Sequence, residues 1–224
     1  MDNKSIHLTL AAAVLCFVLE RGYAAPPVPV AHWSFDGSGL DSSGNHNDAK
    51  RYGNVAYVPG IYGQAAQFHG LGDYFQVANN PAVQLRSTAQ FSVAAYVQPA
   101  SLDQQVILFH GFGYTSRASW FLAVQGGEPE AMLYPGSFVF GTRASNAIAY
   151  TGVTDKAAAG EWAHLAATCD GTTLKLYVDG VLQSSVAAPL PYNSTQNCTS
   201  AAIPAVLSPG TSVCWTTSIS SARP

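Results

Sequence analysis

Short apolar runs separated by turn residues dominate the chain from Val30 onward. These runs alternate with clusters of Gly, Asn, Asp and Pro, and no stretch keeps helical spacing over several turns. Apolar runs of this length, often with period-two alternation, are typical of strands that bury one or both faces. The sequence therefore predicts an all-β fold.

The clearest strand spans residues 91–98, where the odd-numbered positions are all apolar and the even-numbered ones include Ser, Tyr and Gln. A second unit, residues 164–186, reads as three strands joined by Asp170-Gly171 and Asp179-Gly180, which supply the positive φ angles of tight hairpins. Antiparallel strands that are apolar on one face predict a two-layer sandwich. Further strands are expected at residues 30–35, 55–58, 65–68, 74–78, 105–109, 120–124 and 138–141.

The first 24 residues have the pattern of a secretory signal peptide. Lys4 precedes an apolar run over residues 8–19, and Gly22 and Ala24 place small residues at the positions that signal peptidase inspects. The run is shorter than the roughly 20 residues that a membrane-spanning helix needs. We expect cleavage after Ala24 or Ala25 and a secreted location, extracellular or periplasmic, without membrane insertion.

Composition and charge restrict the partners. Only 10% of the 224 residues are charged and the formal net charge is −3, with no basic block. Electrostatic binding of nucleic acid or of an anionic membrane is therefore excluded. Once Cys16 leaves with the signal peptide, Cys169, Cys198 and Cys214 remain, an odd number that leaves at least one thiol unpaired within the chain.

Five sequence blocks carry a resemblance to a known family. They are Ala-His-Trp-Ser-Phe-Asp at 31–36, Asp-Ser-Ser-Gly-Asn-His-Asn-Asp at 41–48, Ala-Ala-Gln-Phe-His-Gly at 65–70 with Gly-Asp-Tyr-Phe at 72–75, Phe-Ser-Val-Ala-Ala-Tyr-Val at 91–97, and Glu-Trp-Ala-His-Leu at 161–165 leading into 170–180. In this order they resemble the laminin-G-like jelly-roll domains of the concanavalin-A-like lectin and glucanase superfamily. The resemblance implies a two-layer antiparallel jelly-roll β-sandwich over residues 25–191. It also implies an extracellular binding or adhesion module, often carbohydrate-directed and calcium-stabilised, and frequently attached to a glycosidase or sialidase.

The tail, residues 192–224, departs from the family pattern. The family closes with strands of the type Leu-Tyr-Ile-Gly and Leu-Asp-Asp-Val-x-Ile-Tyr, whereas residues 197–224 are small and hydroxyl-rich, without alternation. Reading each codon from its third base turns Asn197-Cys198 into Leu and residues 214–216 into Leu-Asp, and synonymous codons admit close matches to both missing patterns. A frameshift near Gln196 is therefore predicted, so that the sandwich as written lacks its last strands. The alternative is a divergent tail closed by a Cys198–Cys214 disulfide.

Motifs of the common hydrolases are missing from the sequence. Glucanases of the superfamily place their carboxylates on one strand as Glu-x-Asp-x-x-Glu or a close variant, and the closest acidic pair here, Glu128 and Glu130, follows two glycines in a predicted loop. The sequence also lacks Gly-x-Ser-x-Gly, His-Glu-x-x-His and a phosphate-binding loop. We therefore expect a protein that is not an enzyme.

Hard oxygen ligands gather in residues 41–48. Asp41, Asn45 and Asp48 are candidate ligands for Ca²⁺, which prefers carboxylate and carbonyl oxygens. The same Asp/Asn/Gly composition is also that of ordinary turns. A calcium site in this loop and a simple turn therefore both remain open.

Candidate ligand-binding residues are aromatic, because apolar faces of sugar rings pack on aromatic planes. Tyr114, Trp120 and Tyr134 lie near predicted loops. The favoured function is a secreted, noncatalytic module that binds carbohydrate, an extracellular glycoconjugate or an extracellular protein. The alternatives are a truncated accessory domain of a larger secreted glycosidase or sialidase, and a nonfunctional frameshifted product.

Overall fold

A computed structural model describes residues 29–70, 72–78, 83, 90–112, 117–125, 136–144, 147–151, 157–187, 198–201 and 213–220. Within these ranges the chain forms fifteen strands and no helix, so none that could cross a membrane. The strands are β1 Ala31–Trp33, β2 Ala49–Tyr52, β3 Ala56–Pro59, β4 Gln64–Gln67, β5 Tyr74–Val77, β6 Gln90–Pro99, β7 Gln105–Phe112, β8 Arg117–Val124, β9 Phe138–Ala144, β10 Ala147–Thr151, β11 Ala163–Asp170, β12 Thr173–Val178, β13 Val181–Ala187, β14 Cys198–Ala201 and β15 Val213–Ser220. The predicted signal peptide, residues 1–24, lies outside the described ranges.

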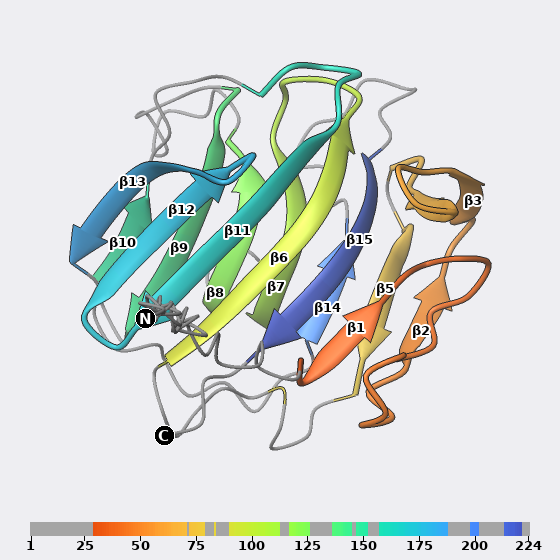
Figure 1. Ribbon diagram of the computed structural model, residues 1–224, viewed down its shortest axis with the longest axis horizontal. Helices are drawn as coiled ribbons and strands as arrows, with labels where there is room; N and C mark the ends of the chain where they lie inside the picture. The colour runs from red at the N-terminus through yellow and green to blue at the C-terminus, as the bar shows by residue number, and fades with distance from the viewer. Residues whose placement is uncertain are drawn as a thin grey trace, which may run out of the picture.

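The strands form two antiparallel sheets stacked face to face (Figure 1). The eight-stranded sheet has the order β13-β12-β11-β6-β15-β4-β3, with β1 paired to β15. The seven-stranded sheet, behind it in Figure 1, has the order β10-β9-β8-β7-β14-β5-β2. The predicted all-β, two-layer antiparallel jelly-roll sandwich is confirmed.

The core lies between the two sheets and follows the alternation seen in the sequence. In β6 the odd-numbered residues from Phe91 to Pro99 are buried and the even-numbered ones are not. The Phe91 ring meets Trp120 and Phe140 of the opposite sheet at centroid distances of 5.6 and 6.0 Å. Burial of side chains of this size stabilises the fold by about 1.5–3 kcal/mol each.

The meander predicted at residues 164–186 is confirmed as β11, β12 and β13. Positive φ angles occur where the Asp-Gly pairs predicted them, at Gly171 (94°), Asp179 (50°) and Gly180 (79°). The first predicted strand, 30–35, is shorter in the structure because Phe35 has a φ of 54°, which ends the extended conformation. The edge strands β2 and β10 were not predicted, and the Lys50-Arg51 pair in β2 is of the kind that protects a sheet edge.

The tail contributes two strands, so the expectation that the last strands are missing is wrong. β14 lies between β5 and β7, and β15 pairs with β6 from Val213 to Ser220 as well as with β1 and β4. The register sets residues 213, 215, 217 and 219 opposite the core-facing positions of β6. These residues are Val, Trp, Thr and Ile, a weak alternation that the sequence analysis missed. The predicted frameshift is a statement about the gene and stays a prediction.

Cys198 and Cys214 fall in different sheets. Cys198 pairs with Val77 and His110 in the seven-stranded sheet, whereas Cys214 pairs with residues of β4 and β6 in the eight-stranded one. The side chains of both cysteines lie outside the described part of the chain. The Cys198–Cys214 disulfide therefore also stays a prediction.

Candidate functional site

The loop that follows β1 is organised around the Asp41 carboxylate. Oδ1 accepts hydrogen bonds from the backbone N–H of His32 (2.9 Å) and of Ser43 (2.8 Å). Oδ2 accepts from Ser43 Oγ (2.9 Å) and from the backbone N–H of Asn47 (2.9 Å). Burial by itself raises the pKa of Asp41, but these hydrogen bonds outweigh it and lower the pKa below its ordinary value of 3.8.

The predicted calcium ligands take part in the same hydrogen-bond network. Asp48 Oδ1 accepts from the backbone N–H of Asp41 (2.9 Å), and Asn45 Nδ2 donates to the carbonyl oxygens of Pro29 (3.2 Å) and Val30 (3.0 Å). With two hydrogen bonds at each Asp41 oxygen, this arrangement does not fit a Ca²⁺ ion, which needs free oxygen lone pairs. The calcium prediction is untested, and because binding would require the loop to exchange hydrogen bonds for metal bonds, we expect calcium to leave the stability unchanged.

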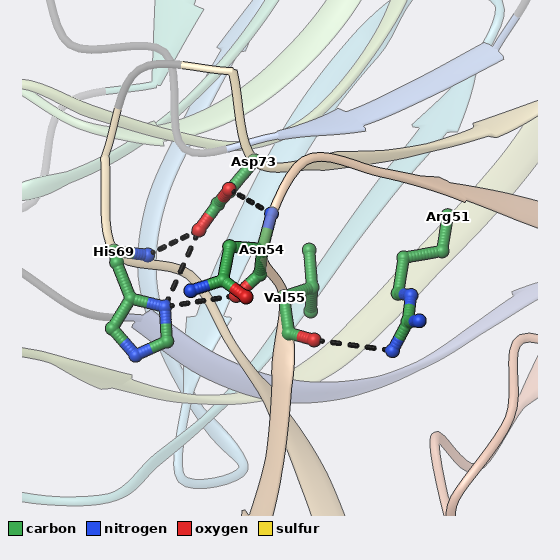
Figure 2. Close-up of polar contacts among 5 residues, drawn as sticks. All are labelled: Arg51, Asn54, Val55, His69 and Asp73. Carbon is green, nitrogen blue, oxygen red and sulfur yellow. Dashed lines mark hydrogen bonds and ion pairs between the residues drawn. The ribbon is translucent and has the colours of Figure 1, made fainter.

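A second carboxylate, Asp73, joins two segments of the loop region (Figure 2). It is 5% exposed and accepts hydrogen bonds from the backbone N–H of Asn54 (2.6 Å) and of His69 (2.9 Å). His69 Nδ1 lies 3.3 Å from Asp73 Oδ2 and 3.1 Å from the Asn54 carbonyl oxygen. Arg51, also in Figure 2, donates from Nη1 to the Val55 carbonyl oxygen (3.3 Å).

These carboxylates bind neighbouring backbone groups and do not cluster with one another. Across the described ranges, no three His, Cys, Asp or Glu side chains come close enough together to hold a metal ion. The contacts of Asp41 and Asp73 are mainly to backbone N–H groups. Their chemistry is that of structural acceptors.

The prediction that Trp120 stacks on a ligand is wrong. Trp120 is 0% exposed and lies in β8, where its ring packs against Phe91 across the core and against His110 of β7 at a centroid distance of 6.2 Å. A ring enclosed in this way offers no face to a sugar. The other two predicted residues, Tyr114 and Tyr134, lie outside the described part of the chain.

An aromatic cluster that the sequence analysis missed lies on the outer face of the eight-stranded sheet. Tyr62, between β3 and β4, meets Tyr96 of β6 at a centroid distance of 5.7 Å and an interplanar angle of 76°. Tyr96 in turn meets His164 of β11, its partner in the strand register, at 4.7 Å. A hydrogen bond to Tyr62, then burial, then the charges of Tyr62 and Asp179 raise the pKa of Tyr96.

The strand pairing explains the missed cluster. The pairing of β6 with β11 brings Tyr96 to His164, and the β3–β4 hairpin brings Tyr62 to Tyr96. The one signal in the sequence is the polar alternation of β6, which sets Tyr96 on the face opposite the core.

Solved structures show the same fold at low sequence identity. Domain 4 of AbnA, a GH43 extracellular arabinanase from Geobacillus stearothermophilus, in complex with arabinotriose, has a TM-score of 0.63 and 20% identity over 89% of this chain and 96% of that chain. The receptor binding domain of a botulinum neurotoxin C/D mosaic serotype has a TM-score of 0.65 and 14% identity, and the binding domain of Paraclostridial Mosquitocidal Protein 1 a TM-score of 0.67 and 12% identity. Each comparison covers 88% of this chain and 49% of the other, so this chain spans about half the length of those two domains.

The sequence comparisons are consistent with the structural ones. Among curated protein sequences, none is significantly similar to this chain. Residues 69–205, more than half of the 224 residues, match the Laminin_G_3 family, described as the concanavalin A-like lectin/glucanases superfamily. With the two antiparallel sheets and the jelly-roll neighbours, this match establishes that the chain belongs to the Laminin_G_3 family of the concanavalin A-like lectin/glucanases superfamily.

Proposed function

We propose that the protein is a secreted, noncatalytic module that binds carbohydrate on an extracellular glycan or glycoconjugate. The observation that carries this proposal is the likeness to an arabinanase domain solved with arabinotriose, which extends over nearly the whole of both chains. Two further neighbours with this fold are the receptor binding domain of a botulinum neurotoxin and the binding domain of a mosquitocidal protein. Because the fold is shared by many activities, ligand binding is a proposal for this chain.

Three of the described carboxylates act as structural hydrogen-bond acceptors, which supports a noncatalytic role for them. Glycoside hydrolysis requires two carboxyl groups on opposite sides of the scissile bond, about 5–10 Å apart and directed at the substrate. Asp41, Asp73 and Asp170 instead each accept several hydrogen bonds from neighbouring backbone or hydroxyl groups. Side chains used in this way hold loops and turns in place.

A second form of the proposal is that this chain is an accessory domain of a larger secreted glycosidase. The observation that favours it is that the arabinanase neighbour is itself one domain, the fourth, of a GH43 enzyme. Sequencing the gene from the codon for Tyr192 through several hundred bases past the codon for Pro224 distinguishes the two forms. A catalytic domain encoded downstream in the same or the corrected frame would support the accessory role, and a stop codon with no such domain would support the free module.

The same sequencing tests the third possibility, a nonfunctional frameshifted product. That possibility predicts a corrected frame with the Leu-Tyr-Ile-Gly and Leu-Asp patterns, and a present chain that fails to accumulate as a folded protein. A soluble protein that melts cooperatively would refute it.

Glycan binding is tested with the purified secreted protein. Electrophoresis through gels that contain arabinan, galactan or xylan, followed by calorimetric titration with arabinotriose, should show retardation by at least one polysaccharide and no release of reducing sugar. Bovine serum albumin serves as the control for nonspecific retardation. Retardation is the decrease in mobility relative to a gel without polysaccharide. Retardation no greater than that of albumin in every gel refutes the proposed function, and release of reducing sugar refutes the noncatalytic part.

A further inference from the structure

Tyr62 differs from the other aromatic side chains by its exposure. It is 69% exposed, the only exposed Phe, Trp or Tyr among the residues whose burial the structure describes. Its neighbour Ile61 is 41% exposed. Single apolar residues are common on protein surfaces, so exposure by itself indicates no site. Tyr62 is distinguished from such residues by its own contacts and by those of its turn.

The turn that carries Tyr62 is held at both ends. Gly60 N–H donates to the Gly63 carbonyl oxygen (2.9 Å), and Gln64 N–H donates to Asp36 Oδ1 (3.2 Å). Gly63 has a φ of 64°, and a Cβ at this position would lie 3.2 Å from the Asp36 carboxyl. A ring on a fixed turn loses less conformational entropy when a ligand binds than a ring on a free loop. The turn therefore presents the Tyr62 ring in a preorganised position.

The contact with Tyr96 orients Tyr62 and leaves it accessible. The two ring planes meet at 76°, a T-shaped contact that covers at most one face of the Tyr62 ring. The phenols of Tyr62 and Tyr96 also share a hydrogen bond, which is the largest cause of the raised pKa of Tyr96. Because a phenol both donates and accepts, the Tyr62 hydroxyl keeps at least one hydrogen-bonding function for a ligand.

Polar groups adjoin the rings. His164 lies beside Tyr96, and its backbone N–H donates to Asp179 Oδ1 (2.9 Å) while Asp179 N–H donates to the His164 carbonyl oxygen (2.8 Å). The charge of Asp179 reaches the Tyr96 phenol, because it contributes to raising the pKa of that group. The Asp36 carboxylate contacts the turn itself, where it accepts the hydrogen bond from the Gln64 N–H two residues after Tyr62. Two carboxylates therefore flank the aromatic cluster.

We propose that Tyr62, Tyr96 and His164 form the sugar-binding platform of this module, and that its ligand is a neutral glycan. A sugar ring stacks on the open face of Tyr62, and its hydroxyls exchange hydrogen bonds with the Tyr62 phenol and the His164 imidazole. Asp36 and Asp179 repel uronic and sialic acids, whose carboxylates would lie close to like charges. This assignment rests on the proposed function and gives it a site and a class of sugar.

The test uses variants at the exposed ring, where folding is least at risk. Tyr62→Ala removes the stacking surface, Tyr62→Phe keeps the ring and removes the hydroxyl, and Leu40→Ala truncates another exposed side chain (63%) as a matched control. Each secreted protein is run through gels that contain arabinan, galactan, xylan or acidic polygalacturonate. Thermal melts confirm that the variants fold.

We expect Tyr62→Ala to weaken binding of the best neutral polysaccharide by at least about tenfold, equivalent to about 1.4 kcal/mol. Tyr62→Phe should lie between wild type and Tyr62→Ala, and Leu40→Ala should match wild type. If wild type is retarded in no gel, the proposed function is itself refuted. If wild type binds and Tyr62→Ala binds equally well, the module stands and this site is refuted. Tighter binding to polygalacturonate than to every neutral polysaccharide refutes the neutral-ligand assignment.

Discussion

Replacing Asp41 by alanine should destabilise the sandwich more than replacing any other carboxylate of the same loop. The change removes the acceptor of four hydrogen bonds, one of them from the backbone of His32 in β1 and one from the backbone of the buried Asn47. Asp48→Ala, seven residues along, removes an exposed carboxylate that accepts one hydrogen bond from the loop, and serves as the matched control.

The magnitude follows from the number of donors that lose their acceptor. A buried N–H left without a partner costs about 1–3 kcal/mol, and donors that water can reach cost less. With Asn47 buried and His32 partly buried, the expected loss in unfolding free energy is about 2–4 kcal/mol for Asp41→Ala. For a domain of this size that corresponds to a fall in Tm of roughly 5–15 °C. Asp48→Ala should cost less than about 1 kcal/mol.

The pH dependence provides a separate test of the same account. The hydrogen bonds to Asp41 lower its pKa below the ordinary value of 3.8 despite the opposing effect of burial. A carboxyl whose pKa falls on folding stabilises the protein above the pKa of the unfolded chain, and this stability is lost as pH falls through the folded value. The difference in unfolding free energy between wild type and Asp41→Asn should therefore be constant between about pH 5 and pH 7 and shrink below about pH 4.

The assay is urea unfolding of the wild-type, Asp41→Ala, Asp48→Ala and Asp41→Asn proteins, followed by tryptophan fluorescence at several pH values, in buffer with EDTA and in buffer with calcium. Two results would refute the reasoning. One is an Asp41→Ala protein within about 1 kcal/mol of wild type, below the expected loss of about 2–4 kcal/mol. The other is an equal loss for Asp41→Ala and Asp48→Ala that appears only when calcium is supplied, which would mean that both side chains act as metal ligands.

Three further predictions follow from single positions. Gly53→Ala should lower the unfolding free energy by about 3 kcal/mol or more, because at a φ of 74° its Cβ would clash with the Asp73 carboxylate. Gly44→Ala, at a φ of 86° in open space, should lower it by only about 1–2 kcal/mol. Equal losses for the two variants in chemical unfolding would contradict this. The Tm of the wild-type protein should be the same in calcium and in EDTA, and a rise of several degrees in calcium would show that the loop at residues 41–48 binds the ion. Burial raises the pKa of Cys169, so its thiol should resist iodoacetamide in the native state and react in denaturant, and native labelling of the peptide that holds Cys169 would disprove this.

Local sequence patterns predicted most of the fold because they reflect local geometry. In β6 and the meander, period-two alternation and Asp-Gly turns specify strand, exposed face and hairpin within a few residues. The pattern failed in the tail, where Thr217 and several small residues weakened the alternation of β15. β15 is a central strand that is hydrogen-bonded on both edges. Because these bonds help to hold it in the sheet, it can form with a weaker apolar alternation than an isolated strand would require.

The candidate site was much less predictable than the fold. In β8, Trp120, Leu122 and Val124 belong to the main core while Phe121 and Ala123 belong to a second buried cluster with Val106, Phe109 and Val139. A run that is apolar on both faces has no period that indicates which residue is exposed. For this reason Trp120 was assigned to a surface that it does not reach.

By itself, the sequence determined the fold class, most of the strands and the membership of a superfamily, because alternation, turn residues and family blocks are encoded within short stretches. Only the tertiary structure decided what the polar and aromatic groups do. Asp41 acts as a hydrogen-bond acceptor because its loop folds back on β1, and Tyr62, Tyr96 and His164 meet because of one hairpin and one strand register. Contacts between residues so far apart in the chain depend on register and sheet order, which no local pattern contains.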